Sequence, residues 1–203
     1  MTHIGHITLE GADTAAAALF YKTAFGLDSE LRFRESQVST SGFRAFTLSL
    51  MVAQPADVNA LIDAALDAGA TPLKPVARSF WGYGGVVQAP DGSIWKVATS
   101  AKKDTGPVTK RVDQVVLLLG ASDVAASKRF YIERGLTVAK SFGRKYVEFA
   151  SPASAIKLAL YGRRALAKGA GVPPEGTGSH RIVLNSDAGG FTDPDGFVWE
   201  PAD

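Results

Sequence analysis

Apolar and polar positions along the chain follow two periods, and these recur in the same order in each half. Residues 6–10 and 114–120 read HITLE and QVVLLLG, alternating or continuous apolar runs typical of β-strands. A helical pattern follows each run, at 13–27 and 123–136. It opens on an aspartate suited to a helix N-cap and ends on Gly-Leu, where a terminating glycine belongs. Each half is therefore predicted to open with a strand, a helix and a second strand.

The two helical segments share a pair of adjacent aromatic residues, Phe20-Tyr21 and Phe130-Tyr131. Aromatic side chains on one face of an amphipathic helix usually pack against the rest of the core. We therefore expect these pairs on the inner face of each helix, against a sheet.

After this common opening the two halves differ. The first half continues with a strand at 46–52, an amphipathic helix at 56–69 and the aromatic, glycine-rich segment SFWGYGG. The second half instead predicts a hairpin from KYVEF and IKLALYG, then a Gly/Pro-rich loop at 169–178 and a strand at 180–184. Each half has therefore lost a different part of one common plan.

One ten-residue segment occurs twice, as VQAPDGSIWK ending at Lys96 and as FTDPDGFVWE ending at Glu200. Pro-Asp-Gly between apolar runs favours a β-turn, so each copy predicts a hairpin. Strand side chains alternate between the two faces of a sheet. Trp95 and Trp199 are thus expected on one face, with Lys96 and Glu200 on the other.

Between the halves lies the polar segment AKKDTGPVTKR, at 101–111, which Gly-Pro interrupts. Its composition is typical of a linker. We predict an α+β protein with two pseudo-symmetric halves, at 1–100 and 112–203.

Composition and charge restrict the functional classes. The chain is 46% apolar and 21% charged with a net charge of +2, which gives no overall reason to expect nucleic acid as a partner. It has no cysteine, which is compatible with a reducing compartment. The N-terminus lacks the pattern of a secretory signal, and the run VVLLL is too short to span a bilayer. We expect a cytoplasmic protein without a membrane partner, with the basic residues Arg163, Arg164 and Lys168 at a solvated strand end.

Taken together, the repeated strand-helix openings, the VNALIDAALDAGA helix, WGYGG and the closing PDGxxW(E) resemble the vicinal oxygen chelate superfamily. This group includes glyoxalases, bleomycin-resistance proteins and extradiol dioxygenases. The resemblance implies βαβββ units, here called modules, that pair into cupped mixed sheets around a small-molecule ligand or a metal. Four modules in one chain make a monomer the simpler expectation, with a homodimer as the alternative.

Members that use a metal place its ligands on the first strand of a module and after the PDG turn. Carried over to this chain, the resemblance assigns these positions to His6, Thr47, Val116, His180, Lys96 and Glu200. If each half pairs its own two modules, neither cup collects a workable ligand set, because protonated lysine and valine offer no lone pair.

The superfamily also pairs modules in a swapped order, the first with the fourth and the second with the third. That order would bring His6, His180 and Glu200 into one cup, and Thr47, Lys96 and Val116 into the other. Two histidines and a carboxylate suit Fe, Mn, Ni, Co or Zn. Lys96 would then mark a cup that has lost its metal and become structural, or that binds an anion. The sequence leaves both pairings open.

Two functions follow from the resemblance. The first is a divalent-metal enzyme of the glyoxalase or dioxygenase type, acting on a small substrate with adjacent oxygens, with Glu200 as ligand or Glu10 as a nearby base. Glu10 and Glu148 are also candidates for a fourth ligand. The second is a metal-free binding protein of the drug-sequestering type. Its apolar cup would stack a planar ligand against a set of aromatic residues, namely Trp81, Tyr83, Trp95 and Trp199.

Overall fold

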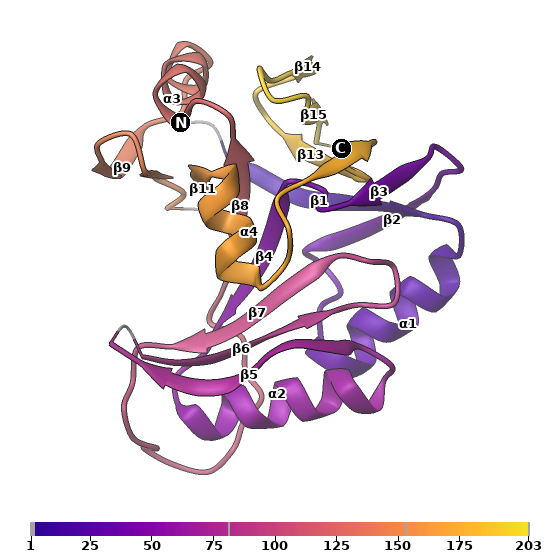
Figure 1. Cartoon of the computed structure of the whole chain (residues 1–203), viewed down its shortest axis with the longest axis vertical. Helices are drawn as coiled ribbons and strands as arrows, with labels where there is room; N and C mark the ends of the chain where they lie inside the picture. Colours follow the sequence, from indigo (N-terminus) through magenta and orange to yellow (C-terminus); the bar gives the residue numbers. More distant parts are fainter. Residues whose placement is uncertain (1–2, 81, 153, 203) are drawn as a thin grey trace.

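A computed structural model describes residues 3–80, 82–152 and 154–202 and has a mixed α+β architecture. Within these residues, strands from both halves form one 13-stranded sheet with a separate two-stranded ribbon, and four helices pack on its faces (Figure 1). None of these helices is long and apolar enough to cross a membrane. The predicted fold class, with paired and partly shortened modules, is confirmed.

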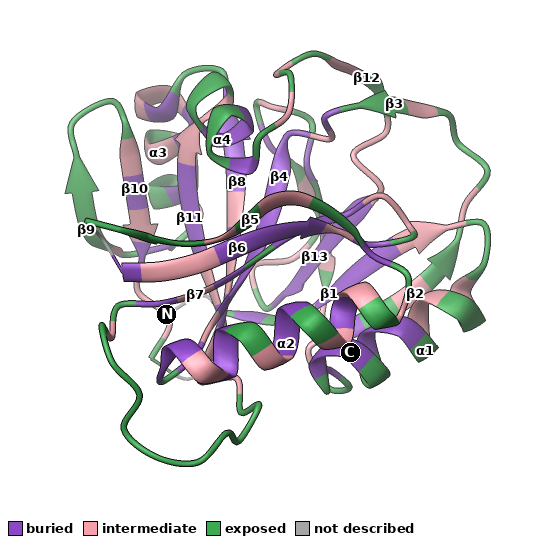
Figure 2. Cartoon of the chain, turned by 60° about the horizontal axis from the view of Figure 1, so that its bottom comes forward, coloured by how far each residue is buried: buried purple, intermediate pink, exposed green. Residues whose placement is uncertain are grey.

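The second module, in the first half, is complete. Its elements are β4 (Phe46–Met51), α2 (Pro55–Asp67), β5 (Thr71–Ser79), β6 (Gly82–Gln88) and β7 (Ile94–Thr99). The strands lie in the order β4-β7-β6-β5, and β4 runs parallel to β7. The apolar residues of α2, including Val58, Leu61 and Ile62, are buried against this sheet, while its opposite face is exposed (Figure 2).

The third module is also complete and repeats the same plan. It contains β8 (Gln114–Ala121), α3 (Val124–Glu133), β9 (Val138–Phe142), β10 (Tyr146–Phe149) and β11 (Ile156–Gly162). Here β8 runs parallel to β11, and β10 and β9 continue the sheet outward. The hairpin predicted from KYVEF and IKLALYG is the antiparallel pair β10–β11.

The first and fourth modules are shortened. The first has β1 (Ile4–Gly11), α1 (Thr14–Phe25), β2 (Leu31–Glu35) and β3 (Thr40–Gly42), and β3 pairs with β12 (Gly176–Gly178). The fourth has only β13 (Ile182–Ser186), β14 (Phe191–Thr192) and β15 (Val198–Pro201). In the fourth module β13 leads to β14 without an intervening helix, so this module lacks the helix that the other three modules have.

The modules pair in the swapped order. Strand β1 lies antiparallel to β13 and β4 lies antiparallel to β8, so the first module joins the fourth and the second joins the third. The two junctions use equivalent backbone hydrogen bonds, from Gly120 N to Ala45 O at 2.6 Å and from Glu10 N to Arg181 O at 3.0 Å. Ala45 and Arg181 also share a positive φ, of 60° and 54°. These matching details relate the two halves by a pseudo-twofold axis.

The first PDG segment fastens a helix to the sheet. The hydroxyl of Tyr21 on α1 donates to Asp91 Oδ2 at 2.9 Å and accepts from Trp95 Nε1 at 3.1 Å. Tyr21 and Trp95 are both fully buried, with ring centroids 5.2 Å apart. Phe20 and Tyr21 are both buried, which confirms their expected position on the inner face of the helix. The PDGxxW segment supplies the aspartate and the tryptophan that bond the tyrosine hydroxyl.

The second copy does the same with one change of residue. Tyr131 on α3 donates to Asp193 Oδ2 at 2.6 Å and accepts from Trp199 Nε1 at 3.3 Å. Asp193 precedes the PDG triplet, and the triplet's own Asp195 instead accepts from Ser122 N and Ser127 Oγ. Because Asp193 also accepts from two backbone N–H groups, its buried carboxylate is well satisfied.

One helix was missed by the sequence reading. Residues Arg163–Ala170 form α4, which packs on β4, β8 and β11, whereas the sequence predicted a solvated strand end and then a loop from residue 169. Leu166, Ala167 and Ala170 are buried together on one side of this helix. Gly171, with a φ of 83°, ends it. A single two-turn helix gives too short a periodic pattern to recognise in sequence.

The connection between the halves is an irregular segment without helix or strand from residue 101 to 113, all of it within the described residues, and it is almost entirely exposed (Figure 2). Side chains at the start of α2 hold it. Gln54 Oε1 accepts from Thr105 N at 2.7 Å, and Asp57 Oδ1 accepts from Thr109 N at 2.7 Å.

Removing the tyrosine hydroxyls should destabilise both halves, but unequally. Tyr131→Phe leaves Asp193 Oδ2 and Trp199 Nε1 unpaired in the core, and we expect it to lower the free energy of unfolding by about 1–3 kcal/mol. Tyr21→Phe should cost less, because Asp91 Oδ2 keeps the hydrogen bond from Ser93 Oγ. Urea denaturation of both variants measures the difference. An equal or reversed order would contradict this ranking.

The same tyrosines should make the fold sensitive to alkali. Burial and the neighbouring carboxylates of Asp91 and Asp193 raise the pKa of Tyr21 and Tyr131 well above their ordinary 10.0. The unfolded chain therefore loses these protons first, so the free energy of unfolding should fall as pH rises above about 10. Denaturation between pH 8 and 11 measures the slope, which should be smaller in the Tyr21→Phe/Tyr131→Phe double variant. Identical slopes would count against this explanation.

Candidate functional site

A cavity with a volume of about 720 Å³ lies where the second and third modules meet. Side chains from β4, from strands β6 to β11 and from α4 line it. We call it the central cup. Helix α4 closes one side, because Leu166 and Ala170 pack there with Val86 and Ile94 in a small apolar cluster. The volume is in the range of small-molecule binding sites.

The floor of the central cup is polar. Ser49 on β4 lies in register with Lys96 on β7, and Thr47 lies two residues along β4, so the three side chains project from one face of the sheet. Thr47 and Ser49 are only 5% and 6% exposed. Within the part of the chain that the structure describes, neither hydroxyl has a hydrogen-bond partner.

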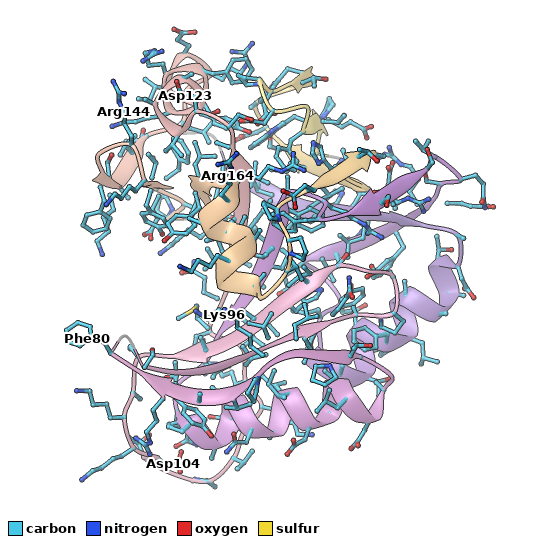
Figure 3. All side chains as sticks on the ribbon, viewed as in Figure 1. Phe80, Lys96, Asp104, Asp123, Arg144 and Arg164 are labelled. Atoms are coloured by element: carbon cyan, nitrogen blue, oxygen red, sulfur yellow. The ribbon has the colours of Figure 1, made fainter. Side chains whose placement is uncertain are left out.

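Lys96 is the cation of this floor. Its side chain is open to solvent through the cup and lies on the side of the sheet that α4 covers (Figure 3). Burial by the surrounding walls, and the charge of Lys74, lower the pKa of Lys96. Among the described residues no carboxylate lies within ion-pair distance of it.

One wall of the central cup is aromatic. Phe142, Tyr146 and Tyr161 follow one another across β9, β10 and β11, with successive ring centroids 6.0 Å apart. Phe142 is 59% exposed, which is unusual for a phenylalanine. Lys140 Nζ lies 5.8 Å from the centroid of the Phe142 ring. This wall offers planar surface that a bound ligand could cover.

Glu148 is the acidic residue of the lining, and its charge is already compensated. Lys157 Nζ lies 3.1 Å from Glu148 Oε1, and Tyr146 donates to Oε2 at 2.8 Å. Burial opposes ionisation of this carboxyl, but the bonds from Tyr146 and Lys157 outweigh it, so the pKa of Glu148 is lowered. Glu148 therefore acts as a fixed acceptor for its two neighbours.

The other cup, between the first and fourth modules, is occupied by an ion pair. His6, Asn185 and Glu200 lie in register across β1, β13 and β15. Arg34 on β2 donates to both oxygens of Glu200, at 2.9 and 2.5 Å, and also approaches Glu10 at 3.6 Å. The hydrogen bonds from Arg34 lower the pKa of Glu200. Both predicted catalytic carboxylates are thus held by one guanidinium.

His180 does not face this cup. It precedes β13, where its Nδ1 lies 2.7 Å from Arg44 O and its Nε2 lies 3.0 Å from Asp195 O. Its ring also stacks on Phe197, with centroids 4.1 Å apart. The Nδ1 contact joins the second half to the first, and the Nε2 contact lies within the second half.

The metal site predicted from His6, His180 and Glu200 does not fit this arrangement. No group of three or more His, Cys, Asp or Glu side chains within the described residues is placed to hold a metal. The strand predicted at 180–184 begins two residues later, at Ile182, so Asn185 takes the position opposite His6. In the central cup the same register places Ser49, rather than Thr47, opposite Val116.

The predicted aromatic pocket also needs correction. Trp95 and Trp199 are 0% and 1% exposed. They pack against Tyr21 on α1 and Tyr131 on α3, on the face of the sheet opposite Lys96 and Glu200. Tyr83 donates to Asn59 on α2 at 2.9 Å, which places it on that face too. Trp81 lies outside the described residues. The alternation expected within each PDGxxW segment is what excludes these tryptophans from the cup.

Thr47 and Lys96, which the swapped pairing assigned to one cup, both line the central cup, as does Glu148. Other lining residues were missed because they alternate with the core. Ser49 and Leu118 come from strands whose other side chains, such as Leu48 and Leu117, are fully buried. The period-2 pattern gave the signal, since it separates the two faces of each strand. It could not say which strands would share one concave face.

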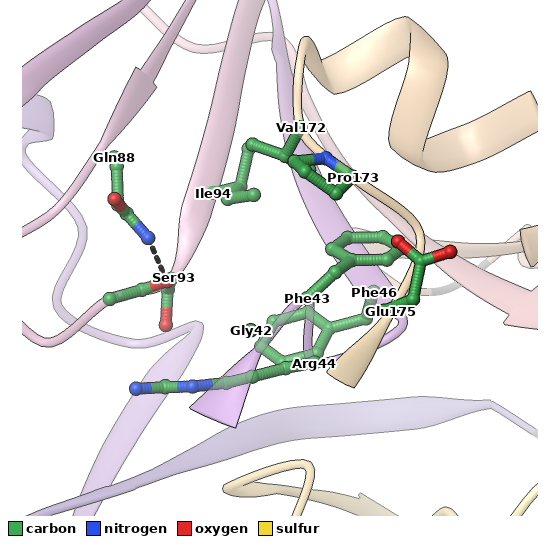
Figure 4. Close-up of a pocket in the computed structure, with 11 residues that line it drawn as sticks. Gly42, Phe43, Arg44, Phe46, Gln88, Ser93, Ile94, Val172, Pro173 and Glu175 are labelled. Carbon is green, nitrogen blue, oxygen red and sulfur yellow. Dashed lines mark hydrogen bonds between the residues drawn. The ribbon is translucent and has the colours of Figure 1, made fainter. Parts of the chain in front are cut away.

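A second cavity, of about 290 Å³, lies between the start of β4, the first PDG turn and the segment after α4 (Figure 4). Its polar side chains hold the turn. Arg44 Nη2 donates to Asp91 O at 2.5 Å and Gln88 Nε2 donates to Gly92 O at 3.1 Å. Gly92 has no Cβ, which leaves room for the Arg44 guanidinium. These contacts favour a structural role for this cavity.

No family model matches the chain, and no curated protein sequence matches it. Solved structures do resemble it. A glyoxalase I variant from Zea mays has a TM-score of 0.62 at 15% identity, over 100% of this chain and 92% of that one. Glyoxalase I from Zea mays has a TM-score of 0.58 at 16% identity, over 92% and 75%.

A putative dioxygenase from Bacillus subtilis is similar in the same way, with a TM-score of 0.54 at 12% identity over 96% of this chain and 71% of that one. Sequence identities this low support only the conclusion that the chains share a fold. The order of the strands, the paired modules and these likenesses agree, and the chain has the vicinal oxygen chelate fold in a tandem, four-module form.

Proposed function

We propose that this protein is a metal-independent binding protein for a small planar organic molecule, which it holds in the central cup. The observation that carries the proposal is the 720 Å³ cavity itself, whose lining combines apolar and aromatic side chains with a few polar groups. Pockets of this size and composition are typical small-molecule sites. This is the second of the two functions that the sequence suggested, moved to a different set of residues.

The chemistry of the available donors favours binding over metal-dependent catalysis. In the central cup the ligand positions of the metal-using relatives are occupied by Ser49, Lys96 and Val116, which offer no pair of strong metal donors. In the other cup, coordination by Glu200 would require breaking its two hydrogen bonds with Arg34. Neither cup therefore supports the enzyme hypothesis as well as the central cup supports a binding function.

The aromatic wall explains how a planar ligand would be held. Phe142 on β9 and Tyr146 on β10 both line the cavity, with their ring planes 35° apart. Covering an exposed ring removes apolar surface from water, at roughly 25 cal/mol per Å². Aromatic pairs in offset or edge-to-face geometry add about 0.5–1.5 kcal/mol. A two-ring ligand would gain from both effects without any metal.

We expect 2-naphthylmethanol, a neutral planar probe, to bind with a stoichiometry of one per chain, and equally well with or without EDTA. Ala165→Trp should weaken this binding at least tenfold, because Ala165 is an exposed α4 residue that lines the cup, and an indole there would fill its mouth. Isothermal titration calorimetry measures both effects.

The matched control is Arg164→Trp, which adds the same side chain to the neighbouring exposed position outside the lining of the cup. It should leave binding unchanged. Loss of binding on addition of EDTA would speak for a metal-dependent site. Equal binding by both tryptophan variants would place the ligand elsewhere and overturn the proposal.

A further inference from the structure

The polar side chains on the floor of the central cup are not used in hydrogen bonds within the described part of the protein. Thr47 and Ser49 line the cup, and among the described residues neither hydroxyl has a hydrogen-bond partner. Most of each residue is buried, but the two hydroxyl oxygens stay open to the cavity. Both hydroxyls can therefore bond to a group that enters the cup.

The type of group that would complete it follows from the donors present. Lys96 supplies an ammonium beside Ser49, in register on the neighbouring strand, and Thr47 adds a second hydroxyl from the same strand face. One cation and two hydroxyls can all donate to the oxygens of a single carboxylate, which has about four acceptor sites. Charge-assisted hydrogen bonds of this kind are the stronger ones.

The charges around the floor agree in sign. Lys140 and Lys145 also line the cup and have no ion-pair partner among the described residues. Lys74, outside the lining of the cup, donates to Lys168 O on α4 at 2.7 Å. The one carboxylate of the lining, Glu148, is compensated by Lys157. The surroundings therefore favour an anion over a cation.

We propose that the ligand of the central cup is a planar aromatic carboxylic acid, with its carboxylate on Lys96, Ser49 and Thr47 and its ring against Phe142 and Tyr146. This inference rests on the proposed function, since it names the ligand class of the same site. The floor recognises the charged end and the wall recognises the planar end, so each half of the ligand meets a separate module.

The lowered pKa of Lys96 fits this arrangement. Without a carboxylate beside it, burial and Lys74 both disfavour the charged ammonium. A bound carboxylate would stabilise the ammonium and relieve that penalty. The negative charge that would stabilise the Lys96 ammonium would thus come from the ligand.

Three naphthalene probes with different end groups test the inference by calorimetry: 2-naphthoate, 2-naphthylmethanol and 2-naphthylmethylammonium. We expect 2-naphthoate to bind at least tenfold more tightly than the neutral alcohol, and the ammonium to bind most weakly. Lys96→Met should weaken 2-naphthoate about ten- to hundredfold, as expected for a charge-assisted hydrogen bond, and leave the alcohol nearly unchanged.

Ser49→Ala and Thr47→Val keep the charge and nearly the volume of the floor, so they test the donors separately from folding. Each should weaken 2-naphthoate about three- to tenfold. Lys103→Met, in the exposed connection between the halves, removes the same formal charge far from the cup and is the control. It should change the affinity for 2-naphthoate by less than about twofold.

The outcomes separate this inference from the function on which it rests. If none of the probes binds, the proposed function falls. If the alcohol and the acid bind equally, or the ammonium binds best, the cup remains a binding site and the carboxylate assignment is overturned. Tighter binding of 2-naphthyl phosphate than of 2-naphthoate would also overturn it, in favour of a phosphate ligand.

Discussion

The antiparallel pairing of β4 with β8, matched by that of β1 with β13, is the constraint on which the rest of the structure depends. It joins the second module to the third and the first to the fourth, and so decides which side chains share a concave surface. Strand register is strict where one face is buried, because a slip of one residue would expose the core. Ser49 and Val116 are therefore fixed opposite each other, as are His6 and Asn185.

The repeated PDGxxW segments fix which face of the sheet each side chain occupies. Each tryptophan donates to a helix tyrosine that also bonds an aspartate of the turn region, so Trp95 and Trp199 are committed to the buried face. Because side chains alternate along a strand, Lys96 and Glu200 lie on the opposite, concave face. The PDGxxW segment therefore has a structural role, because it attaches a helix to the sheet. Its last residue, Lys96 or Glu200, lies in a cup.

The two cups have diverged in what they do with that residue. In the cup between the first and fourth modules, Arg34 on β2 donates to both oxygens of Glu200. The central cup is built from the two complete modules, and Lys96 there has no carboxylate partner among the described residues. Glu200 is thus paired within the protein, whereas Lys96, among the described residues, is not. For this reason the proposed function and the carboxylate inference both concern the central cup.

The sequence by itself determined the elements whose causes are local. The strands and helices of the repeat followed from the apolar periods, the helix starts from Asp13 and Asp123, and the family of folds from the order of these features. The short helix α4 was not predicted, because two helical turns give too short a periodic pattern. The tertiary structure alone decided that β1 lies beside β13, that His180 binds backbone carbonyls, and that Asn185 replaces it opposite His6. The pairing of β1 with β13 and the contact of His180 with Arg44 O join residues more than a hundred positions apart. The positive φ at Arg181, just before β13, has no signature in the residues around it.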